Sequence, residues 1–157
     1  LLRAYEDGSD MKARAEMQRA SYLAGLAFTR AYVGYVHAIS HTLSGFYQIP
    51  HGLANAVILP HVLRFYGESA TKPLAELANI VGIGNINDND ERKAQLFIEE
   101  IEALNRKMNI PSKIKGIINR DVPLMVERAI HEANPLYPVP QILNEDELFY
   151  LYQIIQE

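Results

Sequence analysis

The stretch from Gly34 to Arg64 reads GYVHAISHTLSGFYQIPHGLANAVILPHVLR and contains four of the five histidines of the chain. His37 and His41 are four residues apart, so a helix would place both imidazoles on one face, about one turn apart. Pro50 interrupts this helical pattern, and His51 opens a second apolar segment. The pattern therefore predicts two helices, with two histidines on the first and one at the start of the second.

The composition excludes several classes of protein. A chain of 157 residues is expected to form one domain with a real core. Its net charge is −4 and it has no basic run, which argues against a nucleic-acid or anionic-membrane partner. It has no cysteine, so disulfides, thiolate metal sites and cysteine nucleophiles are excluded. We expect a reducing, cytoplasmic location and no signal peptide.

Helix signals dominate the rest of the chain, and they predict an all-α bundle of about seven helices. Ser21 to Ser40 is apolar enough to suggest a membrane span, but Arg30 and His37 within it favour a buried core helix. Helices are expected at 11–29, 31–46, 52–66, 73–82, from 90 to before Pro111, at 121–132 and from 145 onward, and the first has Ala13, Met17, Ala20, Ala24 and Phe28 at helical spacing.

Local signals mark several of these helix boundaries. Pro60 should kink its helix or remove one backbone hydrogen bond, and Pro73 suits a first helical turn. Asp121 is a candidate N-cap, and Asn144 with Glu147 is typical of a capping box. The polar loop at 82–90 is the best candidate for a subdivision of the chain.

Two groups of side chains could carry chemistry. His37, His41 and His51 could form a metal or catalytic cluster, or could be ordinary hydrogen-bonded helix histidines, and no carboxylate accompanies them in the sequence. The second group is Glu127 and His131, with Glu132 beside them. A solvated ion pair is the favoured interpretation there. His61 has no partner at ligand spacing, so we expect a buried structural histidine.

The histidine stretch closely resembles the signature of the iron-containing (group III) alcohol dehydrogenases. The resemblance comprises the G-x-V-H-x-x-x-H pair, the P-H-G-x-x-N-A-x-x-L-P-H-V run and Phe46-Tyr47 between them. Weaker matches extend it over essentially the whole chain: Asp10 to Arg14, Leu104 to Arg106, Ile110-Pro111 and Asn134-Pro135.

Membership in that family would imply a dehydroquinate synthase-like α-domain over residues 1–157, incomplete at its N-terminus. It would also imply a missing N-terminal nucleotide-binding domain that binds NAD or NADP. By resemblance, His37 and His51 are two of four ligands of a divalent metal. His41 resembles a catalytic histidine that lies near metal and substrate and acts in orientation or proton transfer. Fe²⁺ is the expected metal and Zn²⁺ is possible. The other two ligands, an aspartate and a histidine, would lie upstream of Leu1, so we expect the isolated chain to be inactive.

The resemblance further implies hydride transfer between a small alcohol or aldehyde and the nicotinamide, in a homodimeric enzyme. Two alternatives stay open. One is a relative of glycerol dehydrogenase or dehydroquinate synthase, which the Asn55-Ala56 and Leu59-Pro60-His61-Val62 segments disfavour. The other is a non-catalytic helical fragment or self-associating module. Exposed apolar helix surface would favour this alternative.

Overall fold

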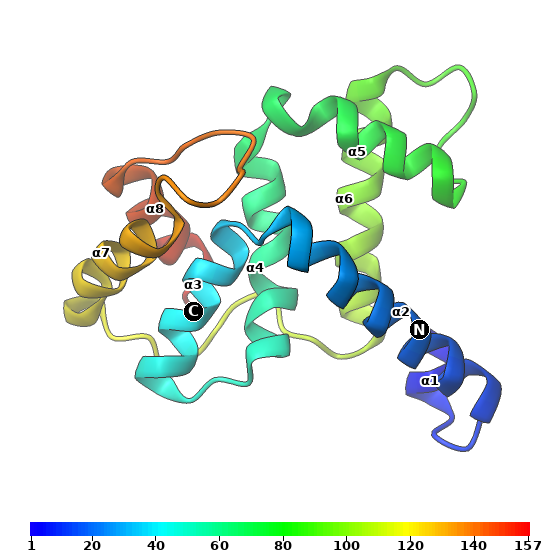
Figure 1. Ribbon diagram of the computed structural model, residues 1–157, viewed down its shortest axis with the longest axis horizontal. Coiled ribbons are helices and arrows are strands. Elements are labelled where there is room, and N and C mark those ends of the chain that lie inside the picture. Colours follow the sequence, from blue (N-terminus) through cyan, green and yellow to red (C-terminus); the bar gives the residue numbers. More distant parts are fainter.

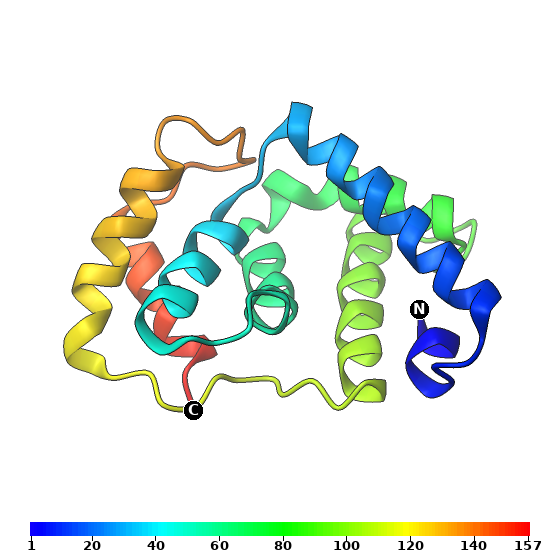
Figure 2. The same ribbon diagram turned by 60° about the horizontal axis from the view of Figure 1, so that its bottom comes forward.

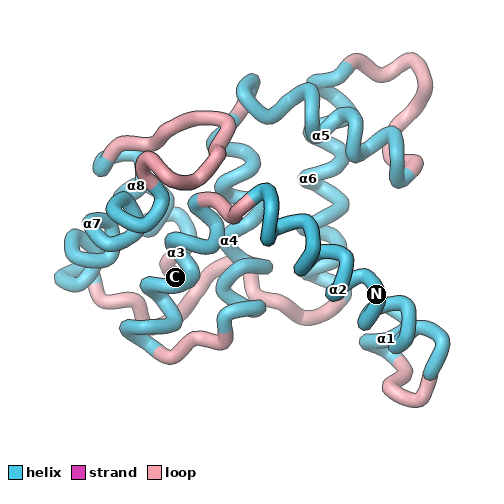
Figure 3. The backbone as a smooth tube through the Cα atoms, viewed as in Figure 1, coloured by secondary structure: helices cyan, strands magenta, loops and turns pink.

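The computed structural model of the chain describes residues 1–157, and its regular secondary structure is helical (Figures 1 and 3). Its only β-type pairing is an isolated bridge between Ile114 and Gln156. The predicted all-α class is therefore confirmed. The helices are α1 (Leu2–Glu6), α2 (Met11–Ala31), α3 (Tyr35–Tyr47), α4 (His51–Tyr66), α5 (Glu68–Val81), α6 (Asp90–Lys107), a 3₁₀ turn η1 (Asn119–Asp121), α7 (Val122–Ala133) and α8 (Glu145–Ile155). The short α1 is the element beyond the seven expected.

Helices α3 and α4 form the centre of the molecule (Figure 1). Helices α7 and α8 pack on one side of this pair, and α6 packs on the other side with α5 beyond it. The inward faces of α3, α4, α7 and α8 supply the largest fully buried side chains, among them Tyr35, Ile39, Ile58, Met125 and Tyr152. The histidine stretch thus lies on the two helices that the rest of the bundle surrounds.

A buried tyrosine fastens the connector after α7 to α3. The Tyr35 hydroxyl donates a hydrogen bond to Oδ1 of Asn134 and accepts one from the backbone N–H of Leu143 at 2.9 Å. The Asn134 amide also donates to the carbonyl of Leu143 at 3.2 Å. Because Tyr35 is fully buried, these partners satisfy its hydroxyl where water cannot.

The proline in α4 behaves as the sequence indicates. Pro60 lies within the helix and has no N–H to donate to the carbonyl of Ala56, four residues earlier. The side-chain amide of Asn105, from α6, donates to that carbonyl at 2.7 Å. A side chain of the neighbouring helix therefore replaces the lost backbone hydrogen bond.

The largest departure from the sequence prediction is α2. Helix α2 ends at Ala31 and α3 begins only at Tyr35, because Tyr32 takes a positive φ of 58° and Gly34 is extended. The chain turns there, and both ribbon views show α2 running away from α3 toward α1 (Figures 1 and 2). Ala13 is the only buried residue of α2, and Phe28 is 54% exposed. The prediction of one buried core helix across Ser21 to Ser40 is therefore wrong for its first half. No helix of the structure is both long and apolar enough to cross a bilayer.

Three boundary predictions have different outcomes. Pro73 does not open α5, because Gly67 adopts a positive φ of 49° and lets α5 begin at Glu68. Asp121 precedes α7 but does not cap it, because its carboxylate accepts a hydrogen bond from the Tyr47 hydroxyl at 3.0 Å. The capping box of Asn144 and Glu147 is confirmed. The 82–90 loop joins α5 to α6, which pack side by side, and the proposed subdivision there stays a prediction.

Candidate metal centre

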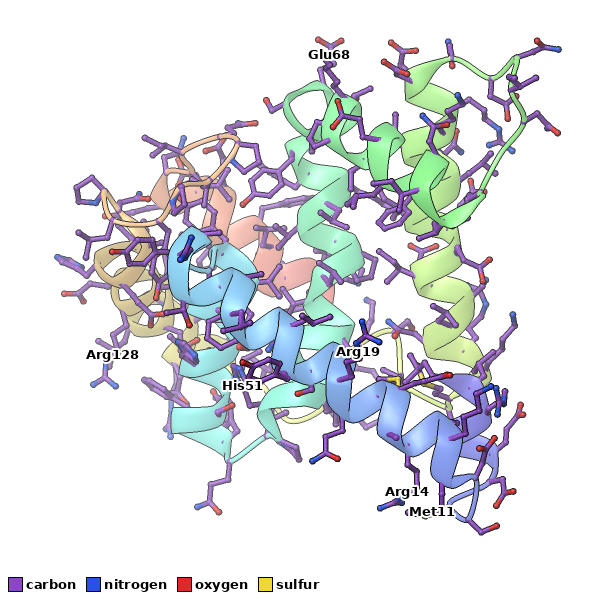
Figure 4. The ribbon with its side chains drawn as sticks, turned by 45° about the vertical axis from the view of Figure 1, so that its right-hand side comes forward. Met11, Arg14, Arg19, His51, Glu68 and Arg128 are labelled. Atoms are coloured by element: carbon purple, nitrogen blue, oxygen red, sulfur yellow. The ribbon has the colours of Figure 1, made fainter.

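The structure brings His37, His41 and His51 together. Their ring centroids lie 5.9 Å apart for His37 and His41, 5.3 Å for His37 and His51, and 5.1 Å for His41 and His51. The rings of His41 and His51 are stacked, with an angle of 17° between their planes. Packing of α3 against α4 creates this cluster, since two of the histidines lie on α3 and His51 is the first residue of α4 (Figure 4).

The hydrogen bonds of Ser40 define the tautomer of His51. The Ser40 hydroxyl donates its single proton to the carbonyl of His37 at 3.0 Å. Its oxygen lies 3.1 Å from Nδ1 of His51, so Ser40 accepts there and Nδ1 carries the proton. Nε2 of His51 is then a lone-pair acceptor, and the Asn55 amide donates to it at 3.0 Å. Since Ser40 is fully buried, it holds the His51 ring in a fixed orientation.

The Asn55 amide nitrogen also approaches His37. It lies 3.5 Å from Nε2 of that residue, so two imidazole nitrogens face one donor. Burial, followed by the neighbouring His51 and His41 rings, lowers the pKa of His37 from its ordinary value of 6.5. The neutral ring is therefore favoured at neutral pH, which is the form that a metal ligand needs.

His41 has a different environment. Its Nδ1 lies 2.7 Å from Oε1 of Glu132, and its side chain is 45% exposed. Glu132 comes from α7, and the hydroxyl of Tyr137 donates to the same oxygen at 2.8 Å. The structure thus pairs His41 with a carboxylate, whereas it gives His51 a serine.

The other predicted residues lie apart from this cluster. His131 does not pair with the carboxylate of Glu127, because its Nδ1 bonds to the backbone carbonyl of Glu127 at 2.7 Å. The predicted ion pair at that site is therefore absent. His61 is hydrogen-bonded, as expected, to the carbonyl of Ser112 at 3.2 Å, but it is half-buried rather than buried.

The residues present fit half of a metal site. The Asn55 amide nitrogen lies between the Nε2 atoms of His37 and His51, so both ring nitrogens face one place. The place opens on a surface hollow of about 460 Å³ lined by Gly34, Val36, His37, Asn55, Ala56 and Leu59. No three His, Cys, Asp or Glu side chains of the chain are grouped so that they could hold a metal together. Completing such a site therefore needs ligands beyond these residues.

Comparison with known proteins identifies the family. A model of the Fe-containing alcohol dehydrogenase family, C-terminal part, matches residues 1–155. The chain belongs to the iron-containing alcohol dehydrogenase family. Within this family it is 44% identical over 137 residues to alcohol dehydrogenase 4 of Saccharomyces cerevisiae, covering 85% of the chain and 34% of that protein. It is 38% identical over 148 residues to 1,3-propanediol dehydrogenase of Citrobacter freundii, covering 93% of the chain and 38% of that protein.

Solved structures of iron-containing alcohol dehydrogenases and their relatives share the fold. A crystal structure of 1,3-propanediol oxidoreductase matches with a TM-score of 0.89 and 35% identity, over 97% of this chain and 40% of that one. An alcohol dehydrogenase from Oenococcus oeni matches with the same TM-score and 31% identity, over 98% of this chain and 40% of that one. The chain thus spans between a third and two-fifths of the length of these proteins.

Four polar residues around the histidines were not singled out as site residues from the sequence: Ser40, Asn55, Glu132 and Tyr137. Asn55 is four residues after His51, so helical spacing alone could have placed it on the same face. Glu132 stood out only as a neighbour of His131. Nothing local links it to His41, which is 91 residues away.

Proposed function

We propose that this chain is the metal-binding and substrate-facing part of an NAD(P)-dependent alcohol dehydrogenase. His37 and His51 serve as two of the metal ligands, and His41 contacts the substrate. The observation that carries the proposal is the convergence of the two Nε2 atoms on the Asn55 amide nitrogen, at 3.5 and 3.0 Å. An imidazole lone pair is a good ligand for Fe²⁺ and for Zn²⁺, and the family supports Fe²⁺.

A divalent metal and NAD(P) would supply one part of the chemistry, and the residues of the chain supply the other. A divalent metal, when bound, would polarise the alcohol oxygen and favour its ionisation. The nicotinamide of NAD or NADP would accept the hydride. Ser40 fixes the orientation of His51, and Val36, Ala56 and Leu59 line the hollow beside His37.

The substrate class follows from the relatives and not from the geometry. The names of similar proteins include 1,3-propanediol dehydrogenase and lactaldehyde reductase. We therefore propose a small alcohol or aldehyde as substrate. A nucleotide-binding domain, a homodimeric state and a cytoplasmic location complete the proposal, on the same family grounds.

A metal titration tests the ligands directly. We expect the chain to bind Co²⁺, as a spectroscopic probe, with an affinity that falls at least about 10-fold in His37→Ala and in His51→Ala, because each variant removes a ligand. His131→Ala is the matched control, since its ring bonds only to the backbone of its own helix. The affinity should also fall as the pH drops through the imidazole range, because a protonated ring cannot bind. Equal affinity in all variants would refute the assignment.

A further inference from the structure

The two nitrogens of His41 are in unequal surroundings. Nδ1 lies 2.7 Å from a carboxylate oxygen of Glu132, whereas Nε2 has no hydrogen-bond partner in the chain. A carboxylate accepts hydrogen bonds but has none to donate, so His41 must donate from Nδ1. When the ring is neutral, Nε2 is therefore left with a lone pair.

The carboxylate is itself held in place. The Tyr137 hydroxyl donates to the same Oε1 of Glu132 at 2.8 Å, and the Tyr137 ring packs against the hydrophobic core. Burial, together with the charge of Glu132, raises the pKa of Tyr137 to about 12. The hydroxyl thus keeps its proton near neutrality and remains a donor. No Lys or Arg forms an ion pair with Glu132, so its only cationic partner is His41 when protonated.

The direction of the ring is also constrained. The face of His41 stacks on His51 at 5.1 Å, so the ring lies beside the predicted metal ligands. Rotation of the ring would break the bond to Glu132. A group that approaches the unpartnered Nε2 of neutral His41 would then meet a lone pair rather than an N–H group.

We propose that Glu132, held by Tyr137, is a positioning residue that fixes His41 as the Nδ1–H tautomer and so leaves its Nε2 lone pair free to accept a proton. The assignment of a substrate rests on the proposed function, whereas the tautomer does not. In alcohol oxidation the O–H proton passes to Nε2, and the electron pair of that bond becomes the second bond of the carbonyl. NAD(P), when bound, would supply the nicotinamide that accepts the hydride of the carbon. His41 then carries two N–H groups, and the resulting positive charge lies against Glu132.

The tautomer can be measured without any activity. In the chain with ¹⁵N-labelled histidine, long-range ¹H–¹⁵N spectra at neutral pH are expected to show His41 protonated at Nδ1 and unprotonated at Nε2. Glu132→Leu should shift the population toward Nε2–H. Glu132→Gln should restore the wild-type pattern, because its amide oxygen can accept the same bond. A merely structural role of Glu132 would not produce this pattern of loss and rescue.

The control is Glu127→Leu, which makes the same change on the same helix. Glu127 is exposed, and its side chain makes no hydrogen bond or ion pair. Its spectrum should match that of the wild type. If Glu132→Leu does not fold, the wild-type and Glu132→Gln spectra still decide the matter. An Nε2–H tautomer of His41 in the folded wild type overturns the proposal, as does an unchanged spectrum in folded Glu132→Leu.

A second measurement uses the full-length enzyme that contains this chain. Glu132→Leu is expected to lower kcat by about 10²-fold, the lower end of the contribution of a positioned general base, with little change in KM. An unchanged kcat would refute the catalytic part of the proposal. A fixed Nδ1–H tautomer in a protein that binds no metal and oxidises no alcohol would instead refute the proposed function and leave the positioning of His41 standing.

Discussion

At the scale of single residues, the Pro60 position shows how a defect in one helix is repaired by another. The carbonyl of Ala56 would be left without its helical donor, and Asn105 supplies one from 49 residues away at 2.7 Å. The Asn105 amide therefore links α6 to α4 at the point where α4 is weakest.

A double-mutant cycle tests this link. Asn105→Ala is expected to lower the free energy of unfolding by about 1–3 kcal/mol, because a partly buried carbonyl loses its donor. In a Pro60→Ala background, Asn105→Ala should lower the free energy of unfolding by less. The alanine at position 60 has a backbone N–H that can donate to the carbonyl of Ala56 in place of the Asn105 amide. We expect a coupling energy of about 1 kcal/mol, measured by urea denaturation of the four proteins.

Gln95→Ala is the matched control for this cycle. Gln95 is exposed on the same helix, and its amide bonds only to the side chain of Glu99. Gln95→Ala should lower the free energy of unfolding only slightly. The decrease should be the same with Pro60 in place and in the Pro60→Ala background. Strictly additive effects of Asn105→Ala and Pro60→Ala would contradict the proposed role of the amide.

At the scale of elements, α2 begins at a well-defined cap. Oδ1 of Asp10 accepts a hydrogen bond from the N–H of Ala13 at 2.9 Å, and Oδ2 forms an ion pair with Arg3 at 2.6 Å. The Ala13 hydrogen bond first, and then Arg3, lowers the pKa of Asp10 below its ordinary value of 3.8. The carboxylate form thus stabilises the start of α2 and its attachment to α1.

The pH dependence of this cap has a definite sign. Because folding lowers the pKa of Asp10, the stabilisation is fully present above pH 3.8 and is lost as the pH falls through the lower folded value. Hydrogen-exchange protection of the first amides of α2 should therefore decrease below about pH 4. Asp10→Asn should remove most of that pH dependence while it keeps a capping oxygen. Glu16→Gln, at an exposed position in α2, should leave the dependence intact, and a loss in that control would point to another group.

At the scale of the whole molecule, the apolar surface of α2 is the most unusual feature. Tyr22 is 66% exposed, and Leu23, Leu26, Phe28 and Tyr32 are each more than half exposed. Helix α2 contacts little beyond α1, so the bundle does not cover these side chains. Tyr22, Leu23 and Leu26 lie on one face of α2 at helical spacing. Exposed apolar surface of this kind is typical of a face that meets other protein.

We expect the purified chain to associate with itself through this face. Sedimentation velocity should show a concentration-dependent increase in mass, and Leu23→Lys with Leu26→Glu should shift the sample toward monomer, because charges on the face must be desolvated in a complex. Leu136→Lys is the control, since Leu136 is 71% exposed but lies in the connector after α7. Association that persists unchanged in the double variant would place the contact elsewhere.

Most helices could be predicted from local signals. Asn144 and Glu147 cap α8 within one turn, Gly82 ends α5 in a left-handed conformation, and Pro50 separates α3 from α4. These signals act between residues a few positions apart, so their energies are already present in the local sequence. The prediction for Pro73 was wrong because Gly67 lets α5 begin earlier, at Glu68. The prediction for Asp121 was wrong because its carboxylate accepts a hydrogen bond from Tyr47, which is distant in the sequence.

By itself, the sequence determined the all-α class, the family and the three histidines of the cluster, since periodicity and motif spacing are properties of neighbouring residues. Only the tertiary structure decided which polar groups surround those histidines. Ser40 meets His51 and Glu132 meets His41 because α3 packs against α4 and α7, over separations of 11 and 91 residues. The exposure of the apolar side chains of α2 was likewise decided by the tertiary structure, because an apolar stripe is buried only when another element covers it.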